Sequence, residues 1–131
     1  MSKGINNKLI VMAKILIIED DLHILDIMKQ ILEDAGYEVV ATHETEDLFN
    51  LISDFQPNLI LMDFMLHGAN GGELCYLIKK HSETAHLPVI IISAYTDMFI
   101  SLGDYGYDAL LSKPFDVNEL VSTIEKFIPA Q

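Results

Sequence analysis

Acidic side chains follow two apolar stretches of this 131-residue chain, each at the point where a buried strand would end. Glu19 and Asp20 come directly after residues 15–18, and Asp63 comes directly after residues 59–62. Apolar runs that lack a two-residue alternation are typical of parallel strands covered on both faces. Because doubly wound sheets place their sites at the carboxyl ends of such strands, we expect these three carboxylates to converge.

Three carboxylates in one pocket need a positive counter-charge. Two unit charges about 4 Å apart, at an effective dielectric of about 20, interact by roughly 4 kcal/mol. That repulsion opposes folding or raises the pKa values of the acids. Oxygen ligands suit Mg²⁺, which keeps several waters and binds through one or two carboxylates and a substrate phosphate. The pattern therefore predicts a magnesium site at Glu19, Asp20 and Asp63.

Two further polar residues mark the ends of later strands. Ser93 closes the apolar run at residues 89–92, and Lys113 follows a weaker strand near residues 108–111. In this topology the Lys113 ammonium can reach Asp63, so that the lysine and Mg²⁺ together balance the three carboxylates. The Ser93 hydroxyl would donate to a phosphoryl group held there. Phosphoryl transfer needs little beyond such positioning and charge compensation, so the pattern favours phosphoryl chemistry at Asp63.

Helical patterns separate the strands. Apolar residues recur at i, i+3, i+4 and i+7 from Ile24 until Gly36, which is a plausible stop. In the last predicted helix, Asp116 and Glu119 have the spacing of an N-cap and its capping-box partner. The apolar stripes that predict helices lie in residues 24–35, 48–55, 74–78 and 117–128.

A further strand near residues 38–42 completes five strand-then-helix units. Right-handed crossovers then put helices on both faces of the sheet. We therefore expect an α/β, flavodoxin-like, doubly wound five-stranded parallel sheet with strand order 2-1-3-4-5. Gly103 and Gly106 interrupt the fourth helical segment, so that helix should be short or irregular. Residues 1–12 are expected to form an N-terminal extension, and residues 13–129 a single domain.

Composition excludes several classes of function. The formal net charge of −12 repels phosphate backbones and anionic lipid, so direct binding to nucleic acid is not expected. No apolar run approaches the ~20 residues that a membrane span needs. A single cysteine, Cys75, and an N-terminus without a cleavable leader indicate a cytoplasmic protein. The five histidines lack metal-ligand spacing, so zinc is not predicted, and the glycines at positions 68, 71 and 72 are interpreted as a flexible loop.

Four short motifs, taken together, resemble the response-regulator receiver family over roughly residues 13–129. They are Ile-Glu-Asp-Asp at residues 18–21, Leu-Met-Asp-Phe-Met-Leu at 61–66, Ser-Ala at 93–94 and Lys-Pro at 113–114. The resemblance implies that Asp63 is a phosphoacceptor and that Glu19 and Asp20 hold Mg²⁺. It adds the backbone carbonyl of Met65 as a metal ligand. It also implies that Ser93 and Lys113 contact the phosphoryl oxygens, and that the peptide bond before Pro114 is cis.

The same resemblance implies how the protein would act. The phosphodonor would be a phosphohistidine on a histidine kinase or a histidine phosphotransfer protein. The domain would be a signalling switch and not an enzyme, apart from its own phosphotransfer and dephosphorylation. Its output would be altered contact with an unidentified partner protein, and a homodimer is left open.

Three positions depart from the family pattern. Leu110 stands where the family usually has a switch aromatic, and neither Tyr105 nor Tyr107 is an automatic substitute. The interval between Ser93 and Lys113 is about two residues shorter than the commonest family spacing, which again predicts a truncated fourth helix. His67 stands where the family often has proline, and this replacement would either loosen the loop after the phosphoacceptor or add a titratable group above the site.

The sequence leaves three other functions to consider. A phosphatase-like or dehalogenase-like hydrolase could use Asp63 as a nucleophile, but such enzymes usually carry a second acid two residues later, where this chain has Met65. A receiver-like protein could act without phosphorylation, although all four types of pocket residue are present. A flavin-binding protein would need a phosphate loop after the first strand, and the sequence has none.

Overall fold

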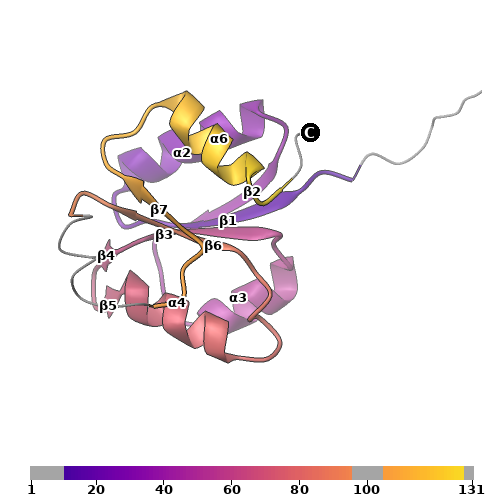
Figure 1. The fold of residues 1–131 in the computed structure, drawn as a ribbon, viewed down its shortest axis with the longest axis vertical. Helices are drawn as coiled ribbons and strands as arrows, with labels where there is room; N and C mark the ends of the chain where they lie inside the picture. Colours follow the sequence, from indigo (N-terminus) through magenta and orange to yellow (C-terminus); the bar gives the residue numbers. More distant parts are fainter. Residues whose placement is uncertain (1–10, 96–104, 129–131) are drawn as a thin grey trace, which may run out of the picture.

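A five-stranded parallel sheet forms the centre of the protein (Figure 1). The computed structural model describes residues 11–95 and 105–128. The strand order is β2-β1-β3-β6-β7, which confirms the predicted doubly wound order for the first to fifth strands of the sheet. The strands are β1 (Lys14–Ile18), β2 (Glu38–Thr42), β3 (Leu59–Asp63), β6 (Val89–Ser93) and β7 (Ala109–Ser112).

Helices cover both faces of this sheet (Figure 1). One face is covered by α2 (Leu22–Asp34) and α6 (Val117–Glu125), and the other by α3 (Leu48–Phe55) and α4 (Gly71–Lys80). Each helical layer buries its apolar stripe in its own hydrophobic cluster against the sheet. The short or irregular fourth helix was predicted on a segment whose residues 96–104 lie outside the described part of the chain.

The central strands are buried on both faces. Every residue of β3 and of β6 is buried, which explains why their sequences show no alternation of polar and apolar residues. Both strands end in a polar residue, Asp63 and Ser93 respectively, and both of these residues are buried. A buried polar group needs a partner, so the carboxyl edge of the sheet is where the fold must supply polar contacts.

Capping residues fix where the outer helices begin. The Asp21 side chain accepts hydrogen bonds from the amides of His23 and Ile24, so α2 begins directly after the acidic pair that ends β1. The helix ends before Gly36, which adopts φ 100°, as the sequence predicted. At α6 the predicted capping box is present, since Asp116 and Glu119 each accept a hydrogen bond from the other's backbone amide.

Asp116→Ala should destabilise the domain by about 1 kcal/mol, because it leaves an amide in the first turn of α6 without its acceptor. Chemical denaturation of the purified variant would measure the change in the free energy of unfolding. Gln30→Ala, on the exposed surface of α2, is a control that should change stability by less than about 0.5 kcal/mol. Equal stability of the Asp116 variant and the parent protein would contradict a stabilising role for the cap.

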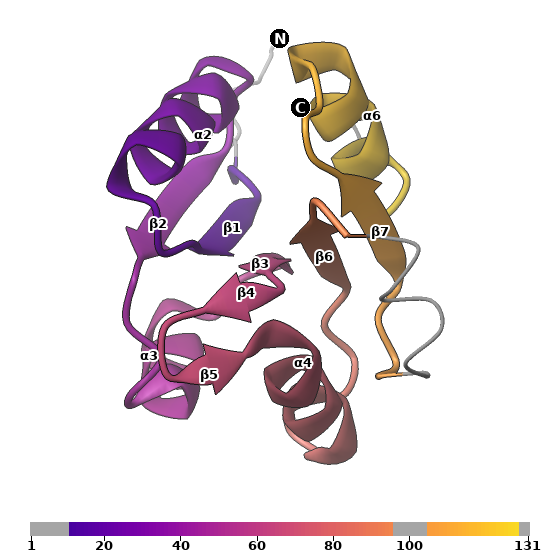
Figure 2. The ribbon, with the colours of Figure 1, turned by 90° about the vertical axis from the view of Figure 1, so that its left-hand side faces the viewer.

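A small antiparallel hairpin follows β3, where the sequence was interpreted as a flexible loop. It consists of β4 (Met65–Leu66) and β5 (Ala69–Asn70), with His67 and Gly68 at the turn. Figure 2 shows this hairpin beside the first turn of α4. The loop interpretation was also wrong for Gly71 and Gly72, which are buried and begin α4. Glycine serves there for close packing and not for flexibility.

Gly71 lies against the end of β3. A Cβ atom at this position would lie 2.1 Å from the carbonyl oxygen of Asp63, a distance that no real side chain tolerates. The Gly71 amide also donates a hydrogen bond of 2.8 Å to the carbonyl of Phe64. The absent side chain therefore lets α4 begin directly against the residue that carries the predicted chemistry.

None of the helices in residues 11–95 and 105–128 is both long enough and apolar enough to span a membrane.

Candidate functional site

The carboxyl edge of the sheet brings together residues from four different strands. Parallel pairing places Ile18 of β1 beside Met62 of β3, so Glu19 and Asp63 follow neighbouring positions. Asp63 in turn pairs with Ile92 of β6, and Ser93 pairs with Ser112 of β7. The convergence predicted from the sequence therefore follows directly from the register of the strands.

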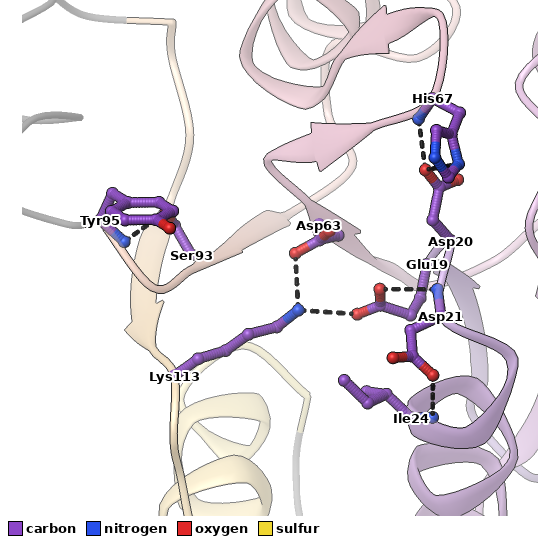
Figure 3. Close-up of polar contacts among 9 residues, drawn as sticks. All are labelled: Glu19, Asp20, Asp21, Ile24, Asp63, His67, Ser93, Tyr95 and Lys113. Carbon is purple, nitrogen blue, oxygen red and sulfur yellow. Dashed lines mark hydrogen bonds and ion pairs between the residues drawn. The ribbon is translucent and has the colours of Figure 1, made fainter.

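Lys113 bridges two of the acids (Figure 3). Its Nζ lies 3.0 Å from Oδ1 of Asp63 and 3.1 Å from Oε1 of Glu19. Glu19 is 2% exposed and Asp63 is 6% exposed, so both carboxylates are nearly removed from water. The second oxygen of Glu19 accepts a hydrogen bond of 3.1 Å from the Asp21 amide. The predicted contact between Lys113 and Asp63 is present, and Glu19 shares it.

Burial controls the proton affinity of Asp63. Burial raises the pKa of its carboxyl group to about 6, against the lowering effect of the hydrogen bond from Lys113. The negative charges of Glu19 and Asp20 also raise this pKa. Burial lowers the pKa of Lys113, but its contacts with Asp63 and Glu19 outweigh that effect, so the net shift is upward. The lysine is therefore charged at neutral pH, and it does not fully compensate the acids around it.

Asp20 points toward the hairpin and not toward the other two acids. Its Oδ2 lies 2.8 Å from Nδ1 of His67, and the backbone amide of His67 donates to the same oxygen (Figure 3). Within the described ranges, no three His, Cys, Asp or Glu side chains stand together in a way that could hold a metal ion. The three acids are thus at one edge, as predicted, but Asp20 must turn before all three could share an ion.

The donor set nevertheless fits a hard divalent cation. Glu19, Asp20, Asp63 and Met65 all line one cavity of about 370 Å³, and three of them offer carboxylate oxygens. With the Lys113 ammonium, three ionised carboxylates leave two negative charges uncompensated. Oxygen ligands and a net charge of this sign and size match Mg²⁺. The cavity is lined by Glu19, Asp20, Asp21, Ile24, Asp63, Met65, Leu66, His67 and Lys113.

Ser93 is held at the same edge by its backbone and its hydroxyl. It is 1% exposed, and its Oγ accepts a hydrogen bond of 2.9 Å from the Tyr95 amide. Its carbonyl accepts a hydrogen bond of 2.9 Å from the Lys113 amide, which ties the end of β6 to the residue that follows β7. The peptide bond between Lys113 and Pro114 is cis, as the family resemblance implied.

Aromatic packing beside the site was not predicted. The rings of Phe64 and Tyr105 have centroids 6.3 Å apart, and the Tyr105 ring also lies over Gly72. Leu110, at the position where the family usually has an aromatic residue, packs with Tyr105 and Tyr107 against the cluster under α3 and α4. No periodic sequence pattern signals this packing, because Tyr105 approaches Phe64 from a segment that lies outside the helices and strands.

Comparison with known proteins agrees with this geometry. The family model of the response regulator receiver domain matches residues 15–125, which is most of the chain. The chain belongs to this family. The receiver domain is the module of two-component signalling that accepts a phosphoryl group, and it is not an enzyme in the usual sense.

Relatives of known name support the assignment. The chain is 41% identical to the nisin biosynthesis regulatory protein NisR of Lactococcus lactis subsp. lactis over 116 residues, which are 86% of this chain and 48% of NisR. The chain spans about half the length of the curated relatives that it matches. A structure of the N-terminal domain of the nisin resistance regulator NsrR is 34% identical, with a TM-score of 0.74, and the match covers 88% of this chain and 97% of that one.

A more distant receiver domain shows the same fold. It is the receiver domain of the sensor histidine kinase PA1611 from Pseudomonas aeruginosa PAO1, described with a magnesium ion in its active-site cleft. Its TM-score is 0.82 at 22% identity, over 90% of this chain and 98% of that one. At this level of identity the likeness concerns the fold alone.

Proposed function

We propose that this receiver domain accepts a phosphoryl group on Asp63 from a phosphohistidine, in a pocket that uses Mg²⁺. The observation that carries the proposal is the position of the Lys113 ammonium, 3.0 Å from Asp63 and 3.1 Å from Glu19 at the buried carboxyl edge of the sheet. A fixed cation beside a buried carboxylate is what a phosphoryl group with its anionic oxygens requires.

The transfer itself needs few groups. An oxygen of Asp63 attacks phosphorus, and the bond from phosphorus to the donor imidazole nitrogen breaks, leaving its electron pair on the nitrogen. Lys113 then faces the anionic oxygens of the phosphoryl group, and the Ser93 hydroxyl is a donor at the neighbouring strand end. Attack requires the ionised carboxyl, and because the pKa of Asp63 is about 6, that form predominates at neutral pH.

Magnesium would complete the charge balance of the pocket. We assign its ligands to the carboxylates of Glu19, Asp20 and Asp63 and to the backbone carbonyl of Met65, all of which line the same cavity. When bound, the ion supplies positive charge for the oxygens of the transferred group. A receiver domain of the same fold, that of PA1611, is described with a magnesium ion in its active-site cleft, which is consistent with a magnesium site at this edge of the sheet.

The partners follow from the proposed chemistry. A histidine kinase or histidine phosphotransfer protein would supply the phosphoryl group, and another protein would read the altered surface of the domain. We take residues 13–129 as the domain that does this and residues 1–12 as its extension, in the cytoplasm. The hydrolase alternative gains nothing from the structure, since Met65 occupies the position of the second acid and is 59% exposed on the hairpin.

Incubation with Mg²⁺ and a small phosphodonor should add one phosphoryl group to the protein, and Asp63→Asn should abolish the addition. The amide keeps the shape of the side chain but is neutral, so it has no carboxylate oxygen that can attack phosphorus. Intact-mass spectrometry would measure the addition, and peptide mapping would locate it.

Asp26→Asn is the matched control, because Asp26 is an exposed acid on α2 that lies away from the pocket lining. It should be phosphorylated like the parent protein. Phosphorylation of the Asp63→Asn variant to the same extent, or a phosphoryl group mapped to a different residue, would refute the proposal.

A further inference from the structure

The turn of the hairpin holds one acid of the proposed metal site. Two groups of His67, its ring Nδ1 and its backbone amide, contact the same carboxylate oxygen of Asp20. Figure 3 shows the imidazole lying directly over this carboxylate, on the side away from Lys113. His67 belongs to the hairpin that starts two residues after Asp63, so the contact joins the end of β1 to the segment that follows the phosphoacceptor.

The three acids of the pocket thus have two different kinds of partner. Glu19 and Asp63 share the Lys113 ammonium, whereas Asp20 is bound to the hairpin. An oxygen that coordinates Mg²⁺ lies about 2.1 Å from the ion and gives its lone pair to it. The two His67 donors already occupy both lone pairs of Oδ2, so the ion must either displace a donor from this oxygen or bind the other carboxylate oxygen once Asp20 has turned toward Glu19 and Asp63. Metal binding through Asp20 must therefore compete with the turn.

We propose that His67 is a positioning residue that holds Asp20 out of the metal site, so that it weakens magnesium binding, and that magnesium binding releases the turn of the hairpin. This inference rests on the magnesium-binding function proposed above. The His67 side chain is 98% exposed, so water can replace Asp20 as its hydrogen-bond partner when the contact breaks. The competition is consequently modest, and it regulates metal affinity without preventing binding.

Calorimetric titration of the full chain with magnesium chloride, at about pH 8, tests the first part. His67→Ala removes the ring donor, and we expect its dissociation constant for Mg²⁺ to fall by about threefold, as suits an exposed charge-assisted contact. His67→Asn is the matched control, because its side-chain amide places a donor near the position of Nδ1. That variant should bind Mg²⁺ as the parent protein does.

Amide hydrogen exchange tests the second part. Saturating Mg²⁺ should speed exchange at the His67 amide, which loses its acceptor on Asp20. The Gly71 amide, which donates to the carbonyl of Phe64 at the base of the same segment, should keep its protection. Loss of protection at both amides would mean that the whole segment unfolds, and that result would overturn the proposed local release.

The outcomes separate this inference from the proposed function. If the parent protein binds Mg²⁺ and is phosphorylated on Asp63, but His67→Ala binds the ion equally well, the role of His67 is refuted and the function stands. Weaker binding by His67→Ala would show that the imidazole assists the metal, which also refutes the role. If no variant binds Mg²⁺, both proposals fail together.

Discussion

Asp63→Asn should raise the free energy of unfolding of the metal-free domain by about 2 to 3 kcal/mol near pH 8. Burial raises the pKa of Asp63 from 3.8 to about 6, and each unit corresponds to about 1.4 kcal/mol. The folded protein then binds this proton more tightly than the unfolded chain does. Stability from this group is therefore highest below about pH 4 and falls as the pH rises toward about 6. Asparagine does not ionise, so the Asp63→Asn variant does not lose this stability as the pH rises.

Chemical denaturation at several pH values, with a chelator present, would measure this effect. The stabilisation should be near zero at pH values below about 4, should grow through the interval up to about 6, and should then stay constant. Asp26→Asn, which changes an exposed acid, should show no such pH dependence. A less stable Asp63→Asn variant at pH 8 would mean that attraction to Lys113 outweighs burial. Adding Mg²⁺ should stabilise the parent protein and not the variant.

Gly71→Ala should destabilise the domain by about 3 kcal/mol and lower phosphorylation of Asp63 at least severalfold. The new methyl group would lie 2.1 Å from the Asp63 carbonyl oxygen and 3.0 Å from the Cα of Phe64, and both of these are backbone atoms. Backbone cannot move aside as a flexible side chain can, so overpacking must displace α4 or the end of β3. Either shift moves the nucleophile relative to Lys113.

Gly68→Ala separates this clash from a general effect of losing a glycine. Gly68 adopts φ +71°, so alanine costs about 1 to 2 kcal/mol of backbone strain there, but no atom lies within 4 Å of the added carbon. This variant should be moderately destabilised and should still be phosphorylated. Denaturation curves and the rate of phosphorylation, measured for both variants under conditions in which each is folded, would make the comparison. Equal phosphorylation rates would show that α4 tolerates the methyl group.

The residues at the carboxyl edge of the sheet could be predicted because the order of residues along the chain is enough to locate the ends of buried strands. A strand buried on both faces has no alternation, and the polar residue that ends it, such as Asp63 or Ser93, is conspicuous. Parallel pairing then brings these ends together whatever the side chains do. The contact of Lys113 with Asp63 followed from that topology, and the additional contact with Glu19 did not, because it depends on the rotamer of a long side chain.

The hairpin and its contacts could not be predicted in the same way. Its strands have two residues each, too few for a periodic pattern, and glycines nearby suggested flexibility. Gly71 is required by a close approach of two backbones, which only coordinates reveal. The orientation of Asp20 toward His67 likewise depends on where the turn lies in space. Magnesium ligation was predicted from residue types alone, and it stays a prediction.

The ion pairs of Lys113 join parts of the sheet that are not neighbours. The lysine follows β7 at one edge, and its ammonium reaches past β6 to the ends of β3 and β1. Any charge added to Asp63 must therefore change the electrostatic force on Lys113. That residue directly follows the edge strand β7, and α6 begins only four residues after it. A covalent change at Asp63, in the central strand β3, would thus alter the contacts of a residue that follows the edge strand β7, through the single side chain of Lys113.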